Sequence, residues 1–302
     1  MTAPIIREYH EEDRADTGAL GTPVIDWWHG NGPGTSLHLV AATEGNEIIG
    51  HLQATDRTLP APSRRPGQCH FSLAVAHRRQ GIGDVLYRCA EQFARERRAH
   101  LLYTSYLETP DAPAAPFLRA RGFAPLERFL PSSLDLMAFD PTQFAGAVRR
   151  AEAQGVRLLT YAERGDSPQN RRKLYALEQA ARASQPFREV GPYLPAPFEA
   201  WEREFAGWDP ETIFLAITAL GDAWVGVVTG LEWYFTGVHP DWWGRGLATA
   251  LKVRCLSEAK RRGVAQMETE NHEDNAAMLM VNRRLGFVFG IPEVACIKRL
   301  HH

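Results

Sequence analysis

Hydrophobic residues in the second half of the chain recur at strand-like and helix-like spacings in turn. Short apolar runs predict strands, and two of them are joined by a hairpin turn at Leu220–Gly221–Asp222. These predicted strands span residues 156–161, 212–219, 223–231, 234–239, 264–271 and 294–300. Apolar positions three and four residues apart predict helices over residues 168–183, 195–208, 247–262 and 275–286. Gly263 follows the third helix at the position where a left-handed residue often ends one.

The first half has the same order of elements. Predicted strands at 36–43, 47–55 and 69–75 precede a predicted helix that begins at Ile82. Six apolar side chains of that helix form one stripe and are expected to face the core: Ile82, Val85, Leu86, Cys89, Ala90 and Phe93. Each half is therefore predicted to be an α/β domain in which a mixed, mostly antiparallel sheet is flanked by helices.

The similarity between the halves extends to short motifs. The turn RRQGIG (78–83) corresponds to WGRGLA (243–248) at an offset of 165 residues. Further on, RARGFAPL (119–126) corresponds to RRLGFVFG (283–290) at an offset of 164. A repeat period of this length indicates two homologous domains, because the units of solenoid proteins are far shorter.

The beginnings of the two copies set the expected domain borders. IIREYHEEDR (5–14) and RLLTYAERGD (157–166) are offset by only 152 residues, so the second copy is about 13 residues longer ahead of its turn. We expect the first domain at 1–140 and the second at 156–302. A helix-containing connector is expected between them, at 141–155.

Composition and charge narrow the class of protein. The 302 residues are 44% hydrophobic and 23% charged, which allows each copy its own core. A formal net charge of −2 gives no attraction to nucleic acid or to an anionic membrane, so neither is expected as a partner. No run reaches the roughly 18 apolar residues of a spanning helix, and residues 1–13 lack the regions of a signal peptide. The four cysteines have no metal-ligand spacing, so we expect no metal site, reduced thiols and a cytoplasmic location.

Each of the two glycine turns, residues 78–83 and 243–248, joins a predicted strand to a predicted helix. A helix N-terminus presents unpaired N–H groups and a positive dipole end, which bind anions such as pyrophosphate. Glycine lets phosphate oxygens approach the backbone closely. Neither turn contains G-x-x-x-x-G-K-[ST], and neither has G-x-G-x-x-G in register with a βαβ unit. An NTPase loop and a dinucleotide fold are therefore not expected.

The repeated strand, glycine turn and helix resemble the GNAT superfamily of acetyl-CoA-dependent N-acetyltransferases. The family signature R/Q-x-x-G-x-G/A is matched fully by residues 78–83. Residues 243–248 match it except at the first position, where Trp243 stands. Val238 and Pro240 fit the V-x-P end of the preceding strand.

Later residues extend the resemblance over nearly the whole chain. The family's Asn, followed eleven residues on by Gly-Phe, appears as Asn275 with Gly286 and Phe287. Two GNAT domains in tandem at about this length are also typical of thiol-biosynthesis acetyltransferases of the mycothiol synthase type. Membership of that group is a narrower version of the same hypothesis.

The resemblance implies acetyl-CoA as the cofactor. Main-chain amides of a glycine turn would hold its pyrophosphate, strand amides near Val238 would polarise the thioester carbonyl, and the pantetheine arm would lie between the splayed fourth and fifth strands. In the second copy the implied binding residues are Val238, Gly244, Arg245, Gly246, Leu247, Ala248 and Asn275. In the first copy they are Arg78, Arg79, Gln80, Gly81, Ile82 and Gly83. The implied reaction is direct acetyl transfer to a primary amine of a small molecule or a peptide.

The first copy departs from the family pattern after its fifth strand. Asp111 and Leu118 stand at the positions of the family's Asn and of the residue seven places later. Its proline-rich loop predicts a helix that starts late, near Ala114. The first domain is therefore interpreted as partly degenerate and the second as catalytic, although the first has the better-matching signature.

The second copy departs from the family at the position of the proton donor. The family frequently has a tyrosine that acts as general acid seven residues after its Asn, and Asn282 stands there instead. A thiol pKa of about 8.5 makes thiolate a tolerable leaving group, so this change slows transfer without preventing it. Asn271 after the fifth strand belongs to the expected catalytic apparatus. Tyr234 is the alternative acid, with packing in the strand as its other reading.

The expected general base is Glu232, at the junction of the third and fourth strands. Glu268 and Glu270 are alternatives, but strand alternation puts them on the face opposite Asn271. The resemblance places the Asn271 face toward the cofactor, which favours Glu232. The competing hypothesis is a non-catalytic acyl-CoA-binding or regulatory protein, motivated by Asn282. The oligomeric state is left open.

Overall fold

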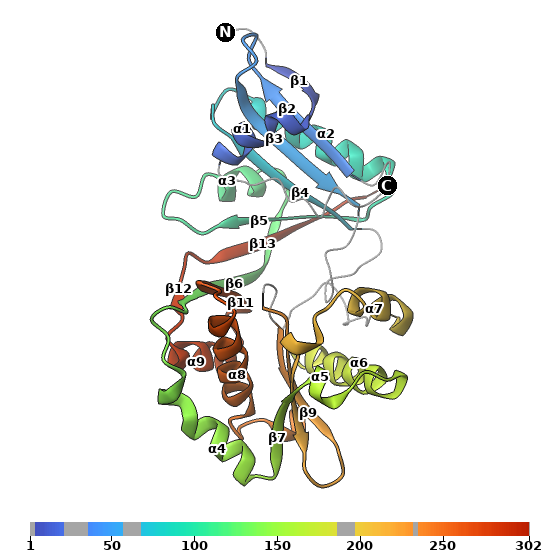
Figure 1. The fold of residues 1–302 in the computed structure, drawn as a ribbon. Coiled ribbons are helices and arrows are strands. Elements are labelled where there is room, and N and C mark those ends of the chain that lie inside the picture. The colour runs from blue at the N-terminus through green and yellow to red at the C-terminus, as the bar shows by residue number, and fades with distance from the viewer. Residues whose placement is uncertain (1–3, 21–35, 57–67, 186–196, 232–234, 302) are drawn as a thin grey trace. The chain divides into compact units, whose positions relative to one another are not determined.

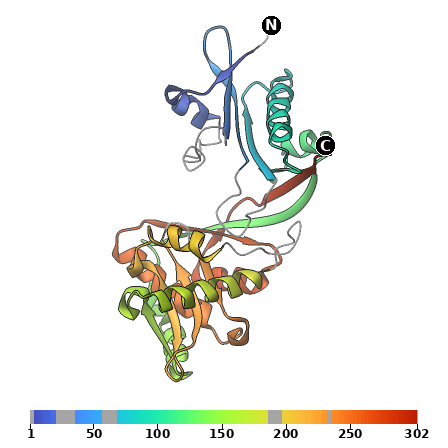
Figure 2. The ribbon, with the colours of Figure 1, turned by 90° about the vertical axis from the view of Figure 1, so that its right-hand side faces the viewer.

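The computed structural model describes residues 4–20, 36–56, 68–185, 197–231 and 235–301. The chain forms two compact units (Figures 1 and 2). The first unit comprises Met1–Glu127 and Val294–His302, and the second comprises Arg128–Glu293.

The first unit is built on strands β1 (Ile5–Glu8), β2 (Ser36–Ala42), β3 (Ile48–Thr55), β4 (Gln68–Val75) and β5 (Leu101–Leu107). The first four are antiparallel neighbours, and β5 is parallel to β4. Its helices are η1 (Glu11–Asp13), α1 (Arg14–Ala19), α2 (Ile82–Glu96) and α3 (Ala114–Arg119). The recorded pairing of β4 with β5 covers only Gln68–His70 against Leu101–Tyr103, so the two strands pair at their beginnings alone.

Helix α2 packs against this sheet with most of the predicted stripe. Ile82, Leu86, Ala90 and Phe93 are buried in one core, together with Tyr87 and Ala94. Val85, expected in the stripe, is instead 39% exposed. The buried face of α2 is therefore rotated toward Tyr87, which also contacts the rings of Phe117 and Phe123.

The second unit contains a four-stranded antiparallel sheet in the order β10-β9-β8-β7. Its strands are β7 (Val156–Thr160), β8 (Phe214–Thr218), β9 (Trp224–Thr229) and β10 (Phe235–Val238). The hairpin between β8 and β9 has the predicted left-handed turn, with φ of 85° at Gly221 and 50° at Asp222.

Helices form separate cores with the two faces of this sheet. Helices α4 (Ala145–Ala153) and α8 (Leu247–Arg261) share one core with the strands. Helices α5 (Tyr161–Arg164), α6 (Pro168–Ala183) and α7 (Phe198–Phe205) form another, rich in aromatic rings, near the short η4 (Pro210–Thr212). The connector expected at 141–155 forms η3 (Pro141–Phe144) and α4, so it is part of the second unit.

The last strands of the two sequence copies are exchanged. Strand β6 (Ala124–Asp135), which ends the first copy, pairs antiparallel with β11 (Gln266–His272) and with β12 (Val288–Phe289). Strand β13 (Glu293–Arg299), which ends the second copy, lies beside β5 in the first unit. Helix α9 (Ala276–Leu285) connects β11 to β12.

Contacts of β13 hold it in the first unit. The Lys298 Nζ donates to the Tyr87 hydroxyl at 2.7 Å and to Glu91 Oε1 at 3.0 Å, both on α2. Val294 and Cys296 are buried in the α2 core. The compact units therefore change over inside β6 and at β13 rather than at the predicted repeat borders, and those borders remain a prediction about the duplicated segments.

Two kinds of feature are absent from the described residues. No helix there has both the length and the apolar character needed to cross a membrane. No cluster of three or more His, Cys, Asp or Glu side chains in that part of the chain could hold a metal ion.

Candidate functional site

The second glycine turn leads from β10 into α8. After Val238 the chain forms η5 (Pro240–Trp242), then two left-handed residues, Gly244 (φ 72°) and Gly246 (φ 79°), the second of which is the N-cap of α8. A β-carbon added at either glycine would have no described atom within 4 Å. Backbone conformation, rather than crowding, therefore requires glycine here, and the space above the turn is open. The first-turn amides of α8 lack partners within the helix and carry the positive dipole end, which suits an anion.

The two tryptophans before the turn have structural contacts. Trp243 is 55% exposed, and its Nε1 donates a hydrogen bond of 2.8 Å to the Val238 carbonyl. Trp242 packs on the core of α4 and α8, and the Arg245 guanidinium lies 4.5 Å from the centre of its ring. The Gln154 Nε2 of the connector donates to the Arg245 carbonyl at 3.2 Å. The indole of Trp243 thus ties the turn back to the end of β10.

The first glycine turn has the same backbone path with different side chains. Arg79 (φ 64°) and Gly81 (φ 83°), the N-cap of α2, are left-handed at the positions offset by 165 from Gly244 and Gly246. An arginine therefore occupies a conformation that favours glycine. Arg78 and Gln80 are exposed, as is Arg79.

The electrostatics of the two helix N-termini differ. The first turn of α2 contains Asp84, which accepts hydrogen bonds from Arg121 at 2.7 Å and from Arg88. These partners, Arg121 first, lower the pKa of the Asp84 carboxyl, so it is charged at neutral pH. The first turn of α8 has no acidic residue. The second glycine turn, residues 243–248, is therefore the better site for a phosphate group, because a carboxylate at the N-terminus of α2 opposes the binding of an anion there.

The remaining residues predicted at the turns contribute through their backbone. The side chains of Ile82 and Leu247 are buried, with relative exposures of 2% and 1%. Gly83 and Ala248, one position further on, are half-buried. Small or inward-facing side chains leave the first-turn amides of both helices accessible.

The strands on either side of the expected pantetheine gap belong to different sheets. Among the described residues β10 pairs with β9 and β11 pairs with β6, and no pairing joins β10 to β11. The absence of pairing agrees with the splaying that the family resemblance implies, and a pantetheine arm between these strands stays a prediction. Glu232 and Tyr234, predicted to be base and alternative acid, lie outside the described residues, so their placement stays a prediction.

Asn271 belongs to a network of three polar side chains. The Asn282 Nδ2 on α9 donates to Asn271 Oδ1 on β11 at 2.7 Å, and Lys252 Nζ on α8 donates to Asn282 Oδ1 at 2.6 Å. Lys252 and Asn282 are buried, and burial lowers the pKa of the lysine to about 7. Sequence reasoning missed Lys252, although the apolar residues around it in α8 were a signal that this lysine cannot reach solvent.

Asn275 has an identified structural role. It is the N-cap of α9, and its Oδ1 accepts a hydrogen bond of 3.2 Å from the Met278 amide. A role for Asn275 in cofactor binding, which the family resemblance implies, remains a prediction; its Nδ2 group could still donate to a ligand.

Glu270 lies on the face of β11 opposite Asn271, and therefore opposite α9. Loss of hydration amid the surrounding protein atoms and, second, the Glu293 carboxylate together raise the pKa of its carboxyl to about 7, although the residue is exposed. A carboxyl with a pKa near the working pH is a suitable general base. The sequence does not reveal this raised pKa, because it depends on surrounding protein atoms and on Glu293, which is distant in sequence.

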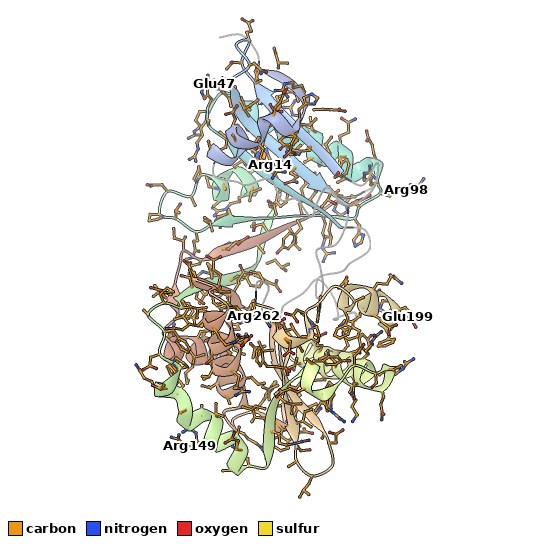
Figure 3. The ribbon with its side chains drawn as sticks, in the orientation of Figure 1. Arg14, Glu47, Arg98, Arg149, Glu199 and Arg262 are labelled. Carbon is orange, nitrogen blue, oxygen red and sulfur yellow. The ribbon has the colours of Figure 1, made fainter. Side chains whose placement is uncertain are left out.

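The aromatic residues of α7 pack inward. Trp201 and Phe205 are buried, and the Trp201 Nε1 donates to the buried Glu178 Oε2 at 2.6 Å. Burial raises the pKa of the Glu178 carboxyl. Glu199 on the same helix is exposed (Figure 3). The aromatic residues of α7 are thus accounted for by the core.

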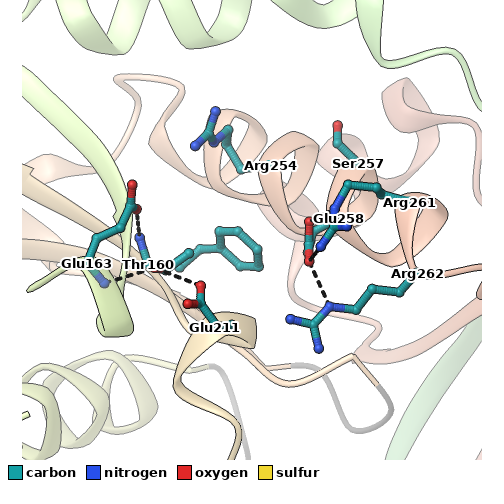
Figure 4. Close-up of a pocket in the computed structure, with 9 residues that line it drawn as sticks. Thr160, Glu163, Glu211, Arg254, Ser257, Glu258, Arg261 and Arg262 are labelled. Atoms are coloured by element: carbon teal, nitrogen blue, oxygen red, sulfur yellow. Dashed lines mark hydrogen bonds and ion pairs between the residues drawn. The ribbon is translucent and has the colours of Figure 1, made fainter. Parts of the chain in front are cut away.

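A polar pocket of about 630 Å³ lies near the C-terminal half of α8, away from the glycine turn (Figure 4). Its lining residues are Thr160, Glu163, Glu211, Phe214, Arg254, Ser257, Glu258, Arg261 and Arg262. Glu258 forms ion pairs with Arg261 and Arg262. Much of the charge in this pocket is therefore already paired within the protein.

Comparison with protein families identifies the pattern in both copies. The chain matches the Acetyltransferase (GNAT) family over residues 3–123 and 174–287. A mycothiol acetyltransferase of Tsukamurella paurometabola is 29% identical over 292 residues, covering 90% of this chain and 93% of the relative. A mycothiol acetyltransferase of Mycobacterium sp. (strain MCS) is 28% identical over 267 residues, covering 83% of this chain and 79% of the relative.

Solved structures confirm the mixed α/β fold and its tandem arrangement. A GCN5-related N-acetyltransferase from Sphaerobacter thermophilus has a TM-score of 0.77 at 21% identity and covers 98% of this chain and 95% of its own. A tandem GNAT protein from the clavulanic acid biosynthesis pathway has a TM-score of 0.65 at 21% identity, with 98% and 97% covered.

Proposed function

Because the chain belongs to the acetyltransferase (GNAT) family, we propose that it transfers an acetyl group from acetyl-CoA to a primary amine of a small molecule or a peptide. The observation that carries this proposal is the second glycine turn. Its left-handed Gly244 and Gly246 leave the N-terminus of α8 open, next to the strand that borders the gap between β10 and β11. The turn can accommodate a pyrophosphate through main-chain amides, with Arg245 supplying positive charge.

We assign the reaction to the second copy. The first turn of α8 contains no acidic residue, whereas the first turn of α2 contains Asp84. The second copy also holds Asn271 in a defined hydrogen-bonded orientation. The first copy would then serve a structural role or bind acyl-CoA without turnover.

The chemistry fixes what the side chains must do. Acetyl-CoA supplies the acetyl group as a thioester, so amide formation breaks the carbon–sulfur bond, releases the sulfur as a thiolate and removes one proton from the amine. A carboxylate takes that proton, and donors near Val238 and Asn271 stabilise the negative charge that develops on oxygen and sulfur.

Two carboxylates compete for the role of base. Glu232 is the residue expected from the sequence. Glu270 is the second candidate, because its pKa of about 7 makes it a proton acceptor at neutral pH. Its face of β11 is opposite the one that contacts α9, which leaves it available to an acceptor on the other side of the strand.

The relatives suggest which acceptor to assay first. Since the matched relatives are named mycothiol acetyltransferases, the precursor that those enzymes acetylate heads a panel of primary amines that also includes amino sugars, polyamines and peptides. Release of free thiol from acetyl-CoA reports transfer to any of them. A protein that does not bind acetyl-CoA by calorimetry would contradict the proposal.

A second function remains in competition for one specific reason. Asn282, at the position of the family's acid, is a buried amide that hydrogen-bonds to Lys252 and Asn271, and a carboxamide is too weak an acid to donate a proton to a thiolate. A non-catalytic acyl-CoA-binding protein would bind acetyl-CoA and release no thiol with any amine. In an enzyme, Glu232→Gln or Glu270→Gln lowers the rate of release while acetyl-CoA still binds.

A further inference from the structure

The inference concerns Lys252, a lysine in the interior of the second unit. It lies in the middle of α8 with 1% of its surface exposed. Its Nζ is 2.6 Å from Asn282 Oδ1 and 5.3 Å from the centre of the Phe287 ring. Burying an ammonium costs far more than burying an aliphatic side chain of the same length, so packing alone does not explain a lysine here.

The lysine determines which way both asparagine amides face. At a pH below about 7, where Lys252 is protonated, its ammonium has N–H donors and no acceptor, so only the oxygen of Asn282 can point toward it. The Nδ2 of Asn282 must then point the other way, where it donates to Asn271 Oδ1 at 2.7 Å. The same reasoning leaves the Nδ2 of Asn271 as the group that donates outside the network. Without the lysine, the two amides could face in either direction.

The end of this network lies where the reaction needs a donor. Asn271 is half-buried on β11, the strand that borders the gap beside β10. Asn282 occupies the family position from which a tyrosine would act as acid. In place of a single acidic side chain, the network therefore provides the Asn271 amide as a donor, and Asn282 and Lys252 fix its orientation.

We propose that Lys252 is a positioning residue for acetyl transfer: through Asn282 it orients and polarises the Asn271 amide toward the thioester and its leaving sulfur. The proposal rests on the proposed function. Lys252 does not touch the substrate and exchanges no proton with it. In its protonated form Lys252 is a cation behind two hydrogen bonds, and it strengthens the donor at their far end.

The test uses variants of the full-length protein with thiol release measured at saturating acetyl-CoA and amine. Lys252→Met keeps the length of the side chain and removes the donor. We expect kcat to fall about tenfold, less than the roughly 100-fold typical of deleting a donor outright, with the calorimetric Kd for acetyl-CoA within about twofold of the native value. Asn282→Leu should have the same effect, and the double variant should lose no more than either single one.

Lys298→Met is the matched control. It removes a half-buried lysine and its two hydrogen bonds, to Tyr87 and Glu91 in the first unit, and should leave kcat unchanged. Asn271→Asp keeps an oxygen to accept from Asn282 but has no outward N–H, so it should lower kcat at unchanged thermal stability. It keeps the test decisive if Lys252→Met does not fold.

A readout independent of turnover completes the test. In protein labelled with ¹⁵N-asparagine, Lys252→Met should shift the Asn271 side-chain amide signals, and Lys298→Met should not. Native kcat in Lys252→Met, or unshifted Asn271 signals, would overturn the proposal. Loss of kcat that only follows loss of acetyl-CoA affinity would overturn it as well. If the native protein transfers acetyl to no amine, the proposed function fails, and the positioning role fails with it. If the native protein is active and Lys252→Met is equally active, only the positioning role fails.

Discussion

The indole nitrogen of Trp243 lies 2.8 Å from the carbonyl oxygen of Val238 and donates a hydrogen bond to it. The bond spans the end of β10 and the beginning of the second glycine turn, so a residue that departs from the family signature stabilises the turn that the signature defines. The exposed face of the indole is still available to a ligand.

Trp243→Phe should therefore weaken acetyl-CoA binding. Phenylalanine keeps an aromatic surface and removes the donor, and one such hydrogen bond contributes about 1 kcal/mol. If the turn must be ordered to bind, this corresponds to about a fivefold increase in Kd by calorimetry. An unchanged Kd would mean that the hydrogen bond has no part in organising the turn.

The left-handed residues of the two turns predict opposite effects on stability. Gly246→Ala places a β-carbon at φ 79° and should destabilise the fold by about 1 kcal/mol as well as weakening acetyl-CoA binding. Arg79→Gly, at φ 64° in the first turn, should stabilise it by up to about 1 kcal/mol. Thermal unfolding of both variants checks the pair; equal shifts of the same sign would contradict it.

Gly237 is confined by its neighbours rather than by its backbone. A β-carbon there would lie 2.5 Å from the Ala181 Cβ and 2.9 Å from the Phe235 ring. Gly237→Ala should cost about 1–3 kcal/mol, because α6 cannot move away without opening the core. Gly207→Ala, whose nearest atom would be the Glu204 carbonyl oxygen at 3.6 Å, is the control and should be close to neutral in urea unfolding.

The pH dependence of the reaction distinguishes the two candidate bases. A base must be deprotonated to act, so if it is Glu270, kcat/KM rises with pH through about 7 and levels off above it. Glu270→Gln should then abolish this limb together with most of the activity. A limb between about pH 4 and 5, where an unperturbed glutamate titrates, would point to a different carboxylate.

The buried lysine predicts a pH dependence of stability. The pKa of Lys252 is lowered from 10.5 to about 7 in the folded protein. As the pH falls from about 10.5 toward 7, the unfolded chain takes up a proton that the folded protein does not, so the folded state loses stability; below about 7 both are protonated and the loss is complete. The free energy of unfolding would be measured between pH 7 and 10 for the native protein and for Lys252→Met. As the pH rises, the native protein should gain stability relative to the variant, so that its deficit narrows. A pH-independent difference would indicate a lysine with an ordinary pKa.

Sequence patterns predicted most of the elements and the two turns because both depend on local chemistry. Periodicity located α8 and its end before Gly263, and glycine spacing located the left-handed positions at Gly244 and Gly246. The rotation of α2, which exposes Val85 and buries Tyr87, could not be predicted, because it depends on contacts with β13 far along the chain.

The polar part of the candidate site was only partly predictable for the same reason. Asn271 and Asn282 were singled out by the family resemblance, Asn282 because it stands where the family frequently has a tyrosine and Asn271 because it follows the fifth strand. Their connection to Lys252 required the packing of α8 against α9, and the raised pKa of Glu270 depends first on the protein atoms that surround it and second on Glu293. Contacts between residues distant in sequence set these properties, and no local pattern records them.

The exchange of β6 and β13 has a consequence for how the protein is made. The neighbour of β5 in the first unit is synthesised only after the whole of the second unit has been synthesised. Until then the edge of β5 and the core around Tyr87 are open, an arrangement that invites pairing with another nascent chain. The first unit, most of which is synthesised first, should therefore finish folding last. A nascent chain that stalls before Val294 would leave an aggregation-prone intermediate rather than a folded first unit.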